Sequence, residues 1–335
     1  MAEAKERAGC WKIGCLGCGG LAVAMVLVFA LVSVLQVSRD RGERPIESRD
    51  VVQRLPTLPE LEALIERGEL GAGGRLNLPD GAPFESPVLA GKVGTVELDL
   101  DVGEFEIVPG AAGEPIRVDG EYEEDAFRLA ESFVEHDDGT WTYRVSMRPR
   151  GGMFGMLFRG AGNNPRNRIT ITLPRGQPFD LVGKVGLGST RIELGGLLVR
   201  RLDLDAGTGE HEISFEEPLL APMESFRLGK SIGDLRVHGL GNASPAVVEI
   251  SQSIGEARID LSGAWAGDAD IRIENRIGEA SVVVPDNVRV QVDRARVALG
   301  EQRVRVPDSD SLPADAPTLR LRLEGSIGDV RITGG

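Results

Sequence analysis

Residues that form disulfides, bind metals or stack on nucleic-acid bases are scarce in this chain. Aromatic residues make up 4% of the 335 positions, and there are only three histidines. The three cysteines, Cys10, Cys15 and Cys18, all lie close to the N-terminus, so no disulfide can link distant parts of the chain. Three cysteines without a neighbouring histidine make a poor zinc site. We therefore predict no disulfide framework and no metal site.

Positive charge is also in deficit, because the net charge is −14 and the isoelectric point is about 4.9. Nucleic-acid binding relies on a basic surface, so this balance argues against a nucleic-acid partner. The sequence has no G-x-S-x-G, no H-E-x-x-H and no P-loop. These absences predict no catalytic residue and no cofactor.

Charged residues are missing from one long segment, residues 13–38, which is almost continuously apolar. About 20 apolar residues span a bilayer as a helix, and no small-residue cleavage site follows this one. We predict an uncleaved transmembrane signal anchor, preceded by a tail (1–12) and followed by a tether with a short helix (39–87). Basic residues flank both ends of the segment, so they do not decide its orientation. The short tail favours a cytoplasmic N-terminus, where the thiols stay reduced.

A short phrase recurs along the second half of the chain: "KSIGDLRVHG", "QSIGEARIDL", "NRIGEASVVV" and "GSIGDVRITG". Apolar and polar residues alternate on both sides of its glycine, which is typical of half-buried strands. The glycine itself is expected at a corner that needs positive φ or a close backbone approach. The aligned glycines lie 21 to 28 residues apart and are Gly188, Gly209, Gly233, Gly255, Gly278, Gly300 and Gly328.

A period near 22 residues without helical segments predicts an all-β fold, a parallel β-solenoid or prism with coils of that length. In this interpretation residues 88–335 form one domain, with an irregular N-terminal part (88–175) and regular coils (176–335). A β-sandwich is the competing fold, because it also uses short strands at regular spacing. A sandwich, however, does not need glycines in phase.

The phrases "GTVELDLDVGEFEIVPG", "SIGDLRVHG" and "SIGDVRI" resemble the bacterial putative-adhesin or toastrack family, formerly a domain of unknown function. The resemblance covers residues 88–335. It implies a β-solenoid that is often attached to a membrane anchor and is related to modules of Lia-type envelope-stress proteins, which carry several anchor segments where this chain has one. The family supplies no catalytic residues. With the predicted anchor, it implies a single-pass protein of the bacterial inner membrane whose domain is extracytoplasmic.

Outward positions of the coils carry charge in columns. Acids such as Asp234 and Glu256 follow the glycine, and arginines such as Arg236 and Arg258 come two residues later. Stacked acids can bind calcium, but the spacing of calcium-binding solenoids is absent. The pattern is typical of a solvated face of ion pairs. His211 falls in an inward column and is interpreted as an interior histidine.

One segment, residues 147–168, has five arginines and no acid, and it contains an apolar cluster between glycines. Basic residues around Met and Phe suit a lipid headgroup interface or an adaptable partner groove. The alternative is a loop that folds back on the solenoid and pairs its arginines with acids. The candidate contact residues are Arg148, Arg150, Met153, Phe154, Met156, Leu157, Phe158 and Arg159.

The chain ends directly after a strand, so the C-terminal coil is predicted to be uncovered. An open solenoid end invites strand addition, and a homo-oligomer through that coil is one expected partner state. The other expected partners are the lipid bilayer, through residues 13–38, and an envelope protein. The sequence thus favours a non-enzymatic scaffold, sensor or adhesin-like module that acts by contact. The alternative is a carbohydrate-active enzyme on the same fold.

Overall fold

The computed structural model describes residues 44–45, 93–150 and 167–335, nearly all of which are strand or turn. The predicted membrane span 13–38 and most of the tether lie outside these residues, so they remain predictions. In the described part of the chain, no helix is long and apolar enough to cross a bilayer. The solenoid described below lies within the compact unit Pro45–Gly335.

The N-terminal part of this unit contains strands that leave the repeat pattern and return to it. β2 is the longest of them and forms a full coil by itself. The strands of this part are β2 (Gly94–Ala112), β3 (Arg117–Glu121), β4 (Phe127–Glu135), β5 (Trp141–Pro149) and β6 (Arg168–Arg175). The two-residue strand β1 (Arg44–Pro45) comes before them, and only its Pro45 belongs to this unit.

The regular part consists of coils that each run up one strand, turn at a glycine and run down another. β7 and β8 pass through this corner without a break, whereas later coils are split into two strands. The elements are β7 (Pro178–Glu193), β8 (Leu198–Ser214), β9 (Ser225–Ile232), β10 (Leu235–His238), η1 (Leu240–Asn242), β11 (Val247–Ile254), β12 (Ala257–Asp260), β13 (Ala269–Ile277), β14 (Ala280–Val284), β15 (Arg289–Leu299), β16 (Gln302–Val304), β17 (Thr318–Ile327) and β18 (Val330–Gly334).

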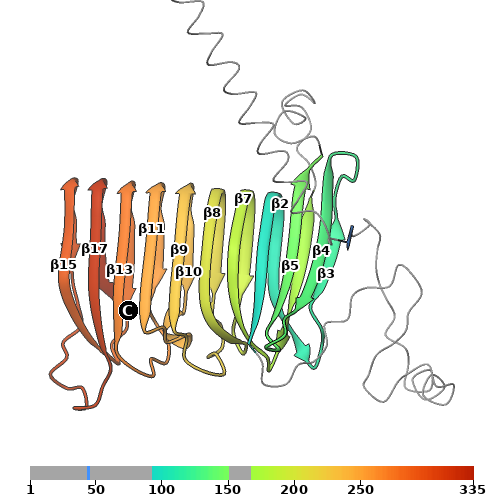
Figure 1. The fold of residues 1–335 in the computed structure, drawn as a ribbon. Helices are drawn as coiled ribbons and strands as arrows, with labels where there is room; N and C mark the ends of the chain where they lie inside the picture. The colour runs from blue at the N-terminus through green and yellow to red at the C-terminus, as the bar shows by residue number, and fades with distance from the viewer. Residues whose placement is uncertain (1–43, 46–92, 151–166) are drawn as a thin grey trace, which may run out of the picture. The chain divides into compact units, whose positions relative to one another are not determined.

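Neighbouring coils pair in parallel and in register, which places the strands side by side as a rack (Figure 1). Ile250, for example, lies between Leu228 and Ile273 in the ladder. This arrangement confirms the predicted parallel β-solenoid and excludes the β-sandwich, because no second, antiparallel sheet faces the first within the described coils.

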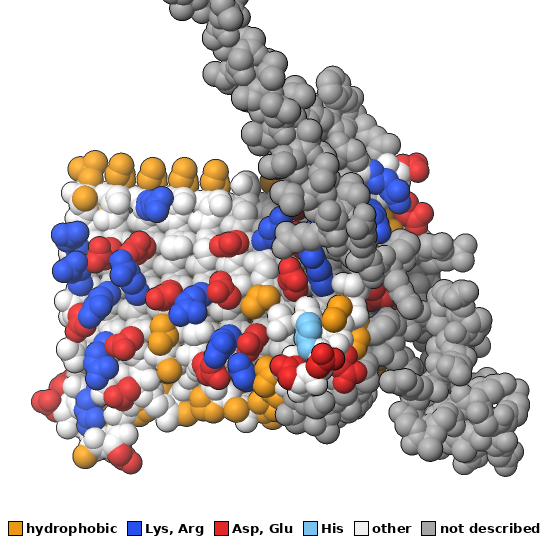
Figure 2. All heavy atoms as spheres, viewed as in Figure 1, with side chains coloured by type: hydrophobic (Ala, Val, Ile, Leu, Met, Phe, Trp, Pro, Cys, Tyr) orange, Lys and Arg blue, Asp and Glu red, His pale blue; other side chains and the backbone are white. Residues whose placement is uncertain are grey.

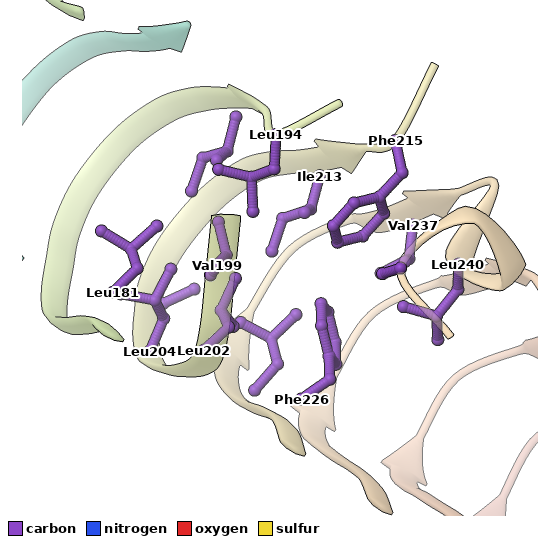
Figure 3. Packing of buried hydrophobic residues seen from close by; sticks show 14 of the residues in the cluster. Leu181, Leu194, Val199, Leu202, Leu204, Ile213, Phe215, Phe226, Val237 and Leu240 are labelled. Carbon is purple, nitrogen blue, oxygen red and sulfur yellow. The ribbon is translucent and has the colours of Figure 1, made fainter. Parts of the chain in front are cut away.

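The core lies inside the coils, between the strand before each corner and the strand after it. Leu202 and Leu204 come from one side of their coil, and Ile213 and Phe215 from the other (Figure 3). The inward residues predicted from the alternation are all at most 1% exposed, namely Leu235, Val237, Ala257, Ile259, Leu261, Ala280, Val282, Val284, Val330, Ile332 and Phe215.

The repeated glycines form a column at one corner, as predicted. Gly255 has φ of 132°, and a Cβ placed on it would lie 2.0 Å from the carbonyl oxygen of Gly233. Gly278 stands in the same relation to Gly255. A side chain at this corner is therefore excluded twice, by the backbone conformation and by the neighbouring coil.

The last two coils do not stack in chain order. β17 pairs with β13 on one side and with β15 on the other, and Gly328 lies between Gly278 and Gly300. The expectation that the C-terminal coil is the uncovered end is therefore wrong. The chain first builds the outermost coil, β15–β16, and then returns through the loop 305–317 to fill the space beneath it.

The opposite end of the solenoid is covered by antiparallel strands. β5 and β6 together form a coil against β2, and the segment 150–167 connects them. β4 pairs antiparallel with β5, and β3 pairs antiparallel with β6. This irregular part is thus a cap on the first coil.

Gly255→Ala tests the corner. We expect it to lower the free energy of unfolding by about 3 kcal/mol or more, because φ is unfavourable for L-residues and the methyl group meets a backbone carbonyl. Gly267→Ala is the matched control, since nothing lies within 4 Å of a Cβ there and φ is ordinary. Chemical denaturation of both variants measures the difference, and equal stabilities would contradict the corner geometry.

Candidate functional site

The residue directly before each corner glycine points out of the solenoid, and these residues form one straight line across the coils. Ile254 is in register with Ile232 and Ile277, and Ile327 lies between Ile277 and Leu299. We call this line the corner row. Its members, in spatial order, are Val102, Leu187, Thr208, Ile232, Ile254, Ile277, Ile327 and Leu299.

The corner row leaves large apolar side chains in solvent. Ile232, Ile254 and Ile277 are 43 to 46% exposed, since each is covered only by its neighbours in the row. Leu299 reaches 68% because it lies on the outermost coil and has one neighbour. Hydrophobic side chains accordingly line the edge where β9, β11, β13, β17 and β15 end (Figure 2).

The alternation of apolar and polar residues in the sequence does not predict that the corner row is exposed. Ile250 and Gln252 point inward, so period two places Ile254 inward as well. The next inward residue is Ala257, an odd number of positions after Gln252, so the phase changes at the corner. The signal that could have revealed this is the recurrence of Ile immediately before a glycine that needs positive φ.

A column of acids runs beside the corner row, one residue after every corner glycine except Gly188, which Ser189 follows. We call it the acidic row; it consists of Glu104, Glu210, Asp234, Glu256, Glu279, Glu301 and Asp329. Arginines two residues further on pair with it, for example Arg303 with Glu301 at 2.7 Å and Arg258 with Glu256 at 2.5 Å. The predicted face of ion pairs is confirmed. Exposed pairs of this kind contribute little to stability.

Of the eight candidate contact residues, the structure describes Arg148 and Arg150. An Nη2 of Arg148 donates to the carboxylate of Asp99, and Nε of Arg150 donates to the carbonyl oxygen of Phe127 at 3.0 Å. Both side chains thus bind the domain itself. Residues 153–159 lie outside the described residues, and their role as a contact remains a prediction.

The structure describes the C-terminal end of the segment 147–168. Asn167 lies next to Gly103, in the position that a corner glycine occupies in the other coils. Its Nδ2 donates to the carbonyl oxygen of Val102 at 3.0 Å, and its own carbonyl accepts from the amide of Glu104 at 2.7 Å. Residues 147–168, which we call the Arg- and Met-rich segment, therefore leave and rejoin the described coils near the corner that carries the corner row.

Asp99 forms the most buried ion-pair cluster among the described residues. Its carboxylate lies 2.8 Å from Arg144 and 3.0 Å from Lys184, and it also pairs with Arg148. Burial alone would raise the pKa of Asp99, but the hydrogen bonds from Arg148 and Lys184 outweigh it and hold this pKa well below its usual range. The cluster ties β2, β5 and β7 together, and each of its charges has a partner.

Polar side chains also lie inside the solenoid beneath the corner. Nζ of Lys230 donates to the carbonyl oxygens of Gly207 and Ile232, both at 2.7 Å, and Nε2 of Gln252 donates to Gly233 at 2.7 Å. Burial lowers the pKa of Lys230 to about 8. These groups satisfy corner carbonyls, so their role is structural.

His211 is buried in the inward column between Thr190 and Leu235, as predicted. Burial, and secondly the charge of Lys230, lowers its pKa to about 4. Its Nε2 has no hydrogen-bond partner among the described residues. A neutral imidazole surrounded by core residues has no access to a substrate.

In the described ranges, no group of three or more His, Cys, Asp and Glu side chains converges as a metal site would require. The fold and its surface define a β-solenoid whose outward groups are an apolar line and columns of ion pairs.

Residues 90–222 match the family described as the N-terminal domain of toast_rack, DUF2154. This match confirms the predicted resemblance to the toastrack family for residues 90–222. No curated protein matches the chain.

Two crystal structures are similar to it. One is a putative cell adhesion protein from Clostridium sporogenes ATCC 15579, with 16% identity and a TM-score of 0.39, over 76% of this chain and 97% of that one. The other is a putative adhesin from Bacteroides fragilis NCTC 9343, with 14% identity and a TM-score of 0.31, over 74% of this chain and 94% of that one.

His211→Leu tests the buried histidine through the pH dependence of stability. The pKa of about 4 in the folded state lies below the unfolded value of 6.5, so the unfolded chain gains a proton first as the pH falls. Stability is therefore lost between pH 6.5 and 4, by up to about 3 kcal/mol. Leucine fits the column, as Leu235 shows in the next coil. The variant should lose less stability over this range in thermal or chemical unfolding; an unchanged slope would contradict the assignment.

Proposed function

We propose that this protein is a non-enzymatic contact module of the bacterial cell envelope, a scaffold or sensor held in the inner membrane by residues 13–38 with its domain outside the cytoplasm. The match of residues 90–222 to the N-terminal domain of toast_rack supports a surface module. The apolar, uncharged segment 13–38 supports the anchor.

The main support for the proposal is that acidic side chains on the coil surface form ion pairs with arginines. Many outward acids pair with arginines of their own or a neighbouring coil, as Glu249 does with Arg227 at 2.9 Å and Glu324 with Arg294 at 3.0 Å. A glycosidase needs two carboxyl groups that converge on one bond, with one of them kept protonated. Acids distributed along ion-pair columns favour a surface that binds by contact over the carbohydrate-active alternative.

The Arg- and Met-rich segment is the part of the proposed contact surface that the sequence indicates. Its apolar cluster around Phe154 lies between arginines, which suits an adaptable groove on a partner protein. Its described C-terminal end, Asn167, lies at the corner beside Val102, which is a member of the corner row.

In-cell photocrosslinking of the full chain tests this function. A photoreactive aromatic residue replaces Phe154, and mass spectrometry identifies the adducts; the same residue at Leu220, which is 60% exposed, is the control. We expect adducts to one envelope protein from position 154 and not from position 220. Adducts only to lipid or to the chain's own coils would contradict a contact role for the segment, and release of sugar from envelope polysaccharide by the purified chain would favour the enzyme.

A further inference from the structure

We propose that residues 289–317 are a self-contained cap that prevents a second copy of the chain from pairing with β17. We call them the distal cap; they comprise β15, β16 and the loop that returns to β17. The inference goes beyond the proposed contact function and does not depend on it. It uses residues that the structure describes, and it needs neither the membrane anchor nor the Arg- and Met-rich segment.

The distal cap begins and ends at the same place. Arg289 and Thr318 are direct partners in the ladder between β15 and β17, and the amide of Arg289 donates to the carbonyl oxygen of Pro317 at 2.8 Å. The guanidinium of Arg289 also donates to the carbonyl oxygen of Ala316 at 3.0 Å. The cap is therefore an excursion from the stack, and the residues that flank it, Val288 and Thr318, lie close together.

The coils beneath the distal cap are held together without it. β17 pairs with β13 along the strand, and β18 pairs with β14. The amide of Thr318 donates to the carboxylate of Asp268 at 2.8 Å, which fastens the start of β17 to the preceding coil. The amide of Gly335 donates to the carbonyl oxygen of Val284 at 2.9 Å. Without the cap, the remaining coils would stack in chain order.

The distal cap covers an edge that can accept another strand. Leu319, Leu321 and Leu323 of β17 are 0% exposed, and the outer backbone groups of β17 pair with β15. The pairing of β17 with β13 shows no register shift, so β17 is a regular strand. A long, regular, apolar edge is a template for pairing with another chain. Without the cap, β17 would be such an edge.

The distal cap itself offers a poor edge. No residue of β15 or β16 is buried, and the register of β15 shifts between Val292 and Arg294. The outward side chains of Arg294 and Arg296 are 56% and 68% exposed. The inward residues Val290, Val292 and Ala295 are also smaller than the leucines beside them. Bulges and exposed charges at an edge oppose strand addition, and solenoids end in polar capping coils.

Charge selects a second copy as the strand that the uncovered edge would accept. Arg322 points outward on β17 and pairs with Asp293 of the distal cap at 3.2 Å. Glu324 points outward as well and pairs with Arg294 of the cap at 3.0 Å. An antiparallel second copy centred on Leu323 would place Arg322 of each copy opposite Glu324 of the other. It would thus replace the ion pairs that the cap supplies.

Deletion of residues 289–317, with Val288 joined directly to Thr318, tests the proposal in the full chain. Sedimentation velocity in detergent compares the self-association of variants that all keep the same N-terminal segment. We expect a folded protein that associates at least about tenfold more tightly than the intact chain, because β17 is uncovered. Adding Arg322→Glu should reverse this, since the two copies then oppose like charges. Arg272→Glu, at the matching position of β13, lies away from the uncovered edge and should not.

Val292→Asp tests the distal cap without deleting it. The new carboxylate would lie on the inward side of β15 beside Leu321, so we expect the cap to detach and self-association to rise as in the deletion. Gln291→Asp, at the exposed neighbouring position of the same strand, is the control and should leave self-association unchanged.

Three results overturn the proposal: a folded deletion variant that stays monomeric, an association that Arg322→Glu does not reduce, and an intact chain that associates as tightly as the deletion. If the deletion variant does not fold, Val292→Asp decides, because increased association supports the proposal and unchanged association overturns it. An overturned cap leaves the proposed contact function standing.

Discussion

The close approach of glycine backbones at one corner is the constraint on which the rest of the structure depends. Each corner carbonyl lies where a Cβ of the next coil would otherwise be, as between Gly233 and Gly255. Stacking at this distance keeps the strands on both sides of the corner in register. It also shifts the phase of the alternation, so that the residue before the glycine points outward. The corner row is therefore a direct consequence of the geometry that allows the coils to stack.

The corner also explains the polar residues inside the solenoid. A tight turn leaves carbonyl groups pointing inward, and a buried carbonyl without a donor is costly. Lys230, Gln252 and Asn275 occupy successive rungs of one ladder and donate to corner carbonyls of their own or a neighbouring coil. The burial of a lysine and two amides thus supports the fold and creates no reactive site.

Much of this could be predicted from the sequence, because the repeat is local. The repeat period predicted the length of the coils, and the alternation predicted inward residues such as Ile259. The aligned glycines predicted the corner. The order of the last two coils could not be derived in this way, since the phrases around Gly300 and Gly328 fit the same pattern. The difference lies in the strands. β17 fills the core with leucines such as Leu321, whereas β15 has smaller inward residues, a bulge at Asp293 and flanking arginines, which are typical of an edge strand.

The candidate site was predicted less well than the fold. The sequence indicated the Arg- and Met-rich segment from its composition, and only its ends are placed by the structure. The corner row was missed, because alternation read through a corner assigns its isoleucines to the core. The direction of each side chain depends on where the backbone bends. The position of the bend depends in turn on contacts with the neighbouring coils, which the sequence pattern of one coil does not contain.

The order of the coils is the central claim, and disulfide trapping tests it most directly. With Cys10, Cys15 and Cys18 replaced by serine, Arg272→Cys is combined with Arg322→Cys in one variant and with Arg294→Cys in another. Positions 272 and 322 are direct partners in β13 and β17, whereas position 294 lies on β15, beyond β17. The account predicts that oxidation links 272 to 322 and leaves 272 and 294 as free thiols. A bond between 272 and 294, with none between 272 and 322, would show that the coils stack in chain order and would contradict the account.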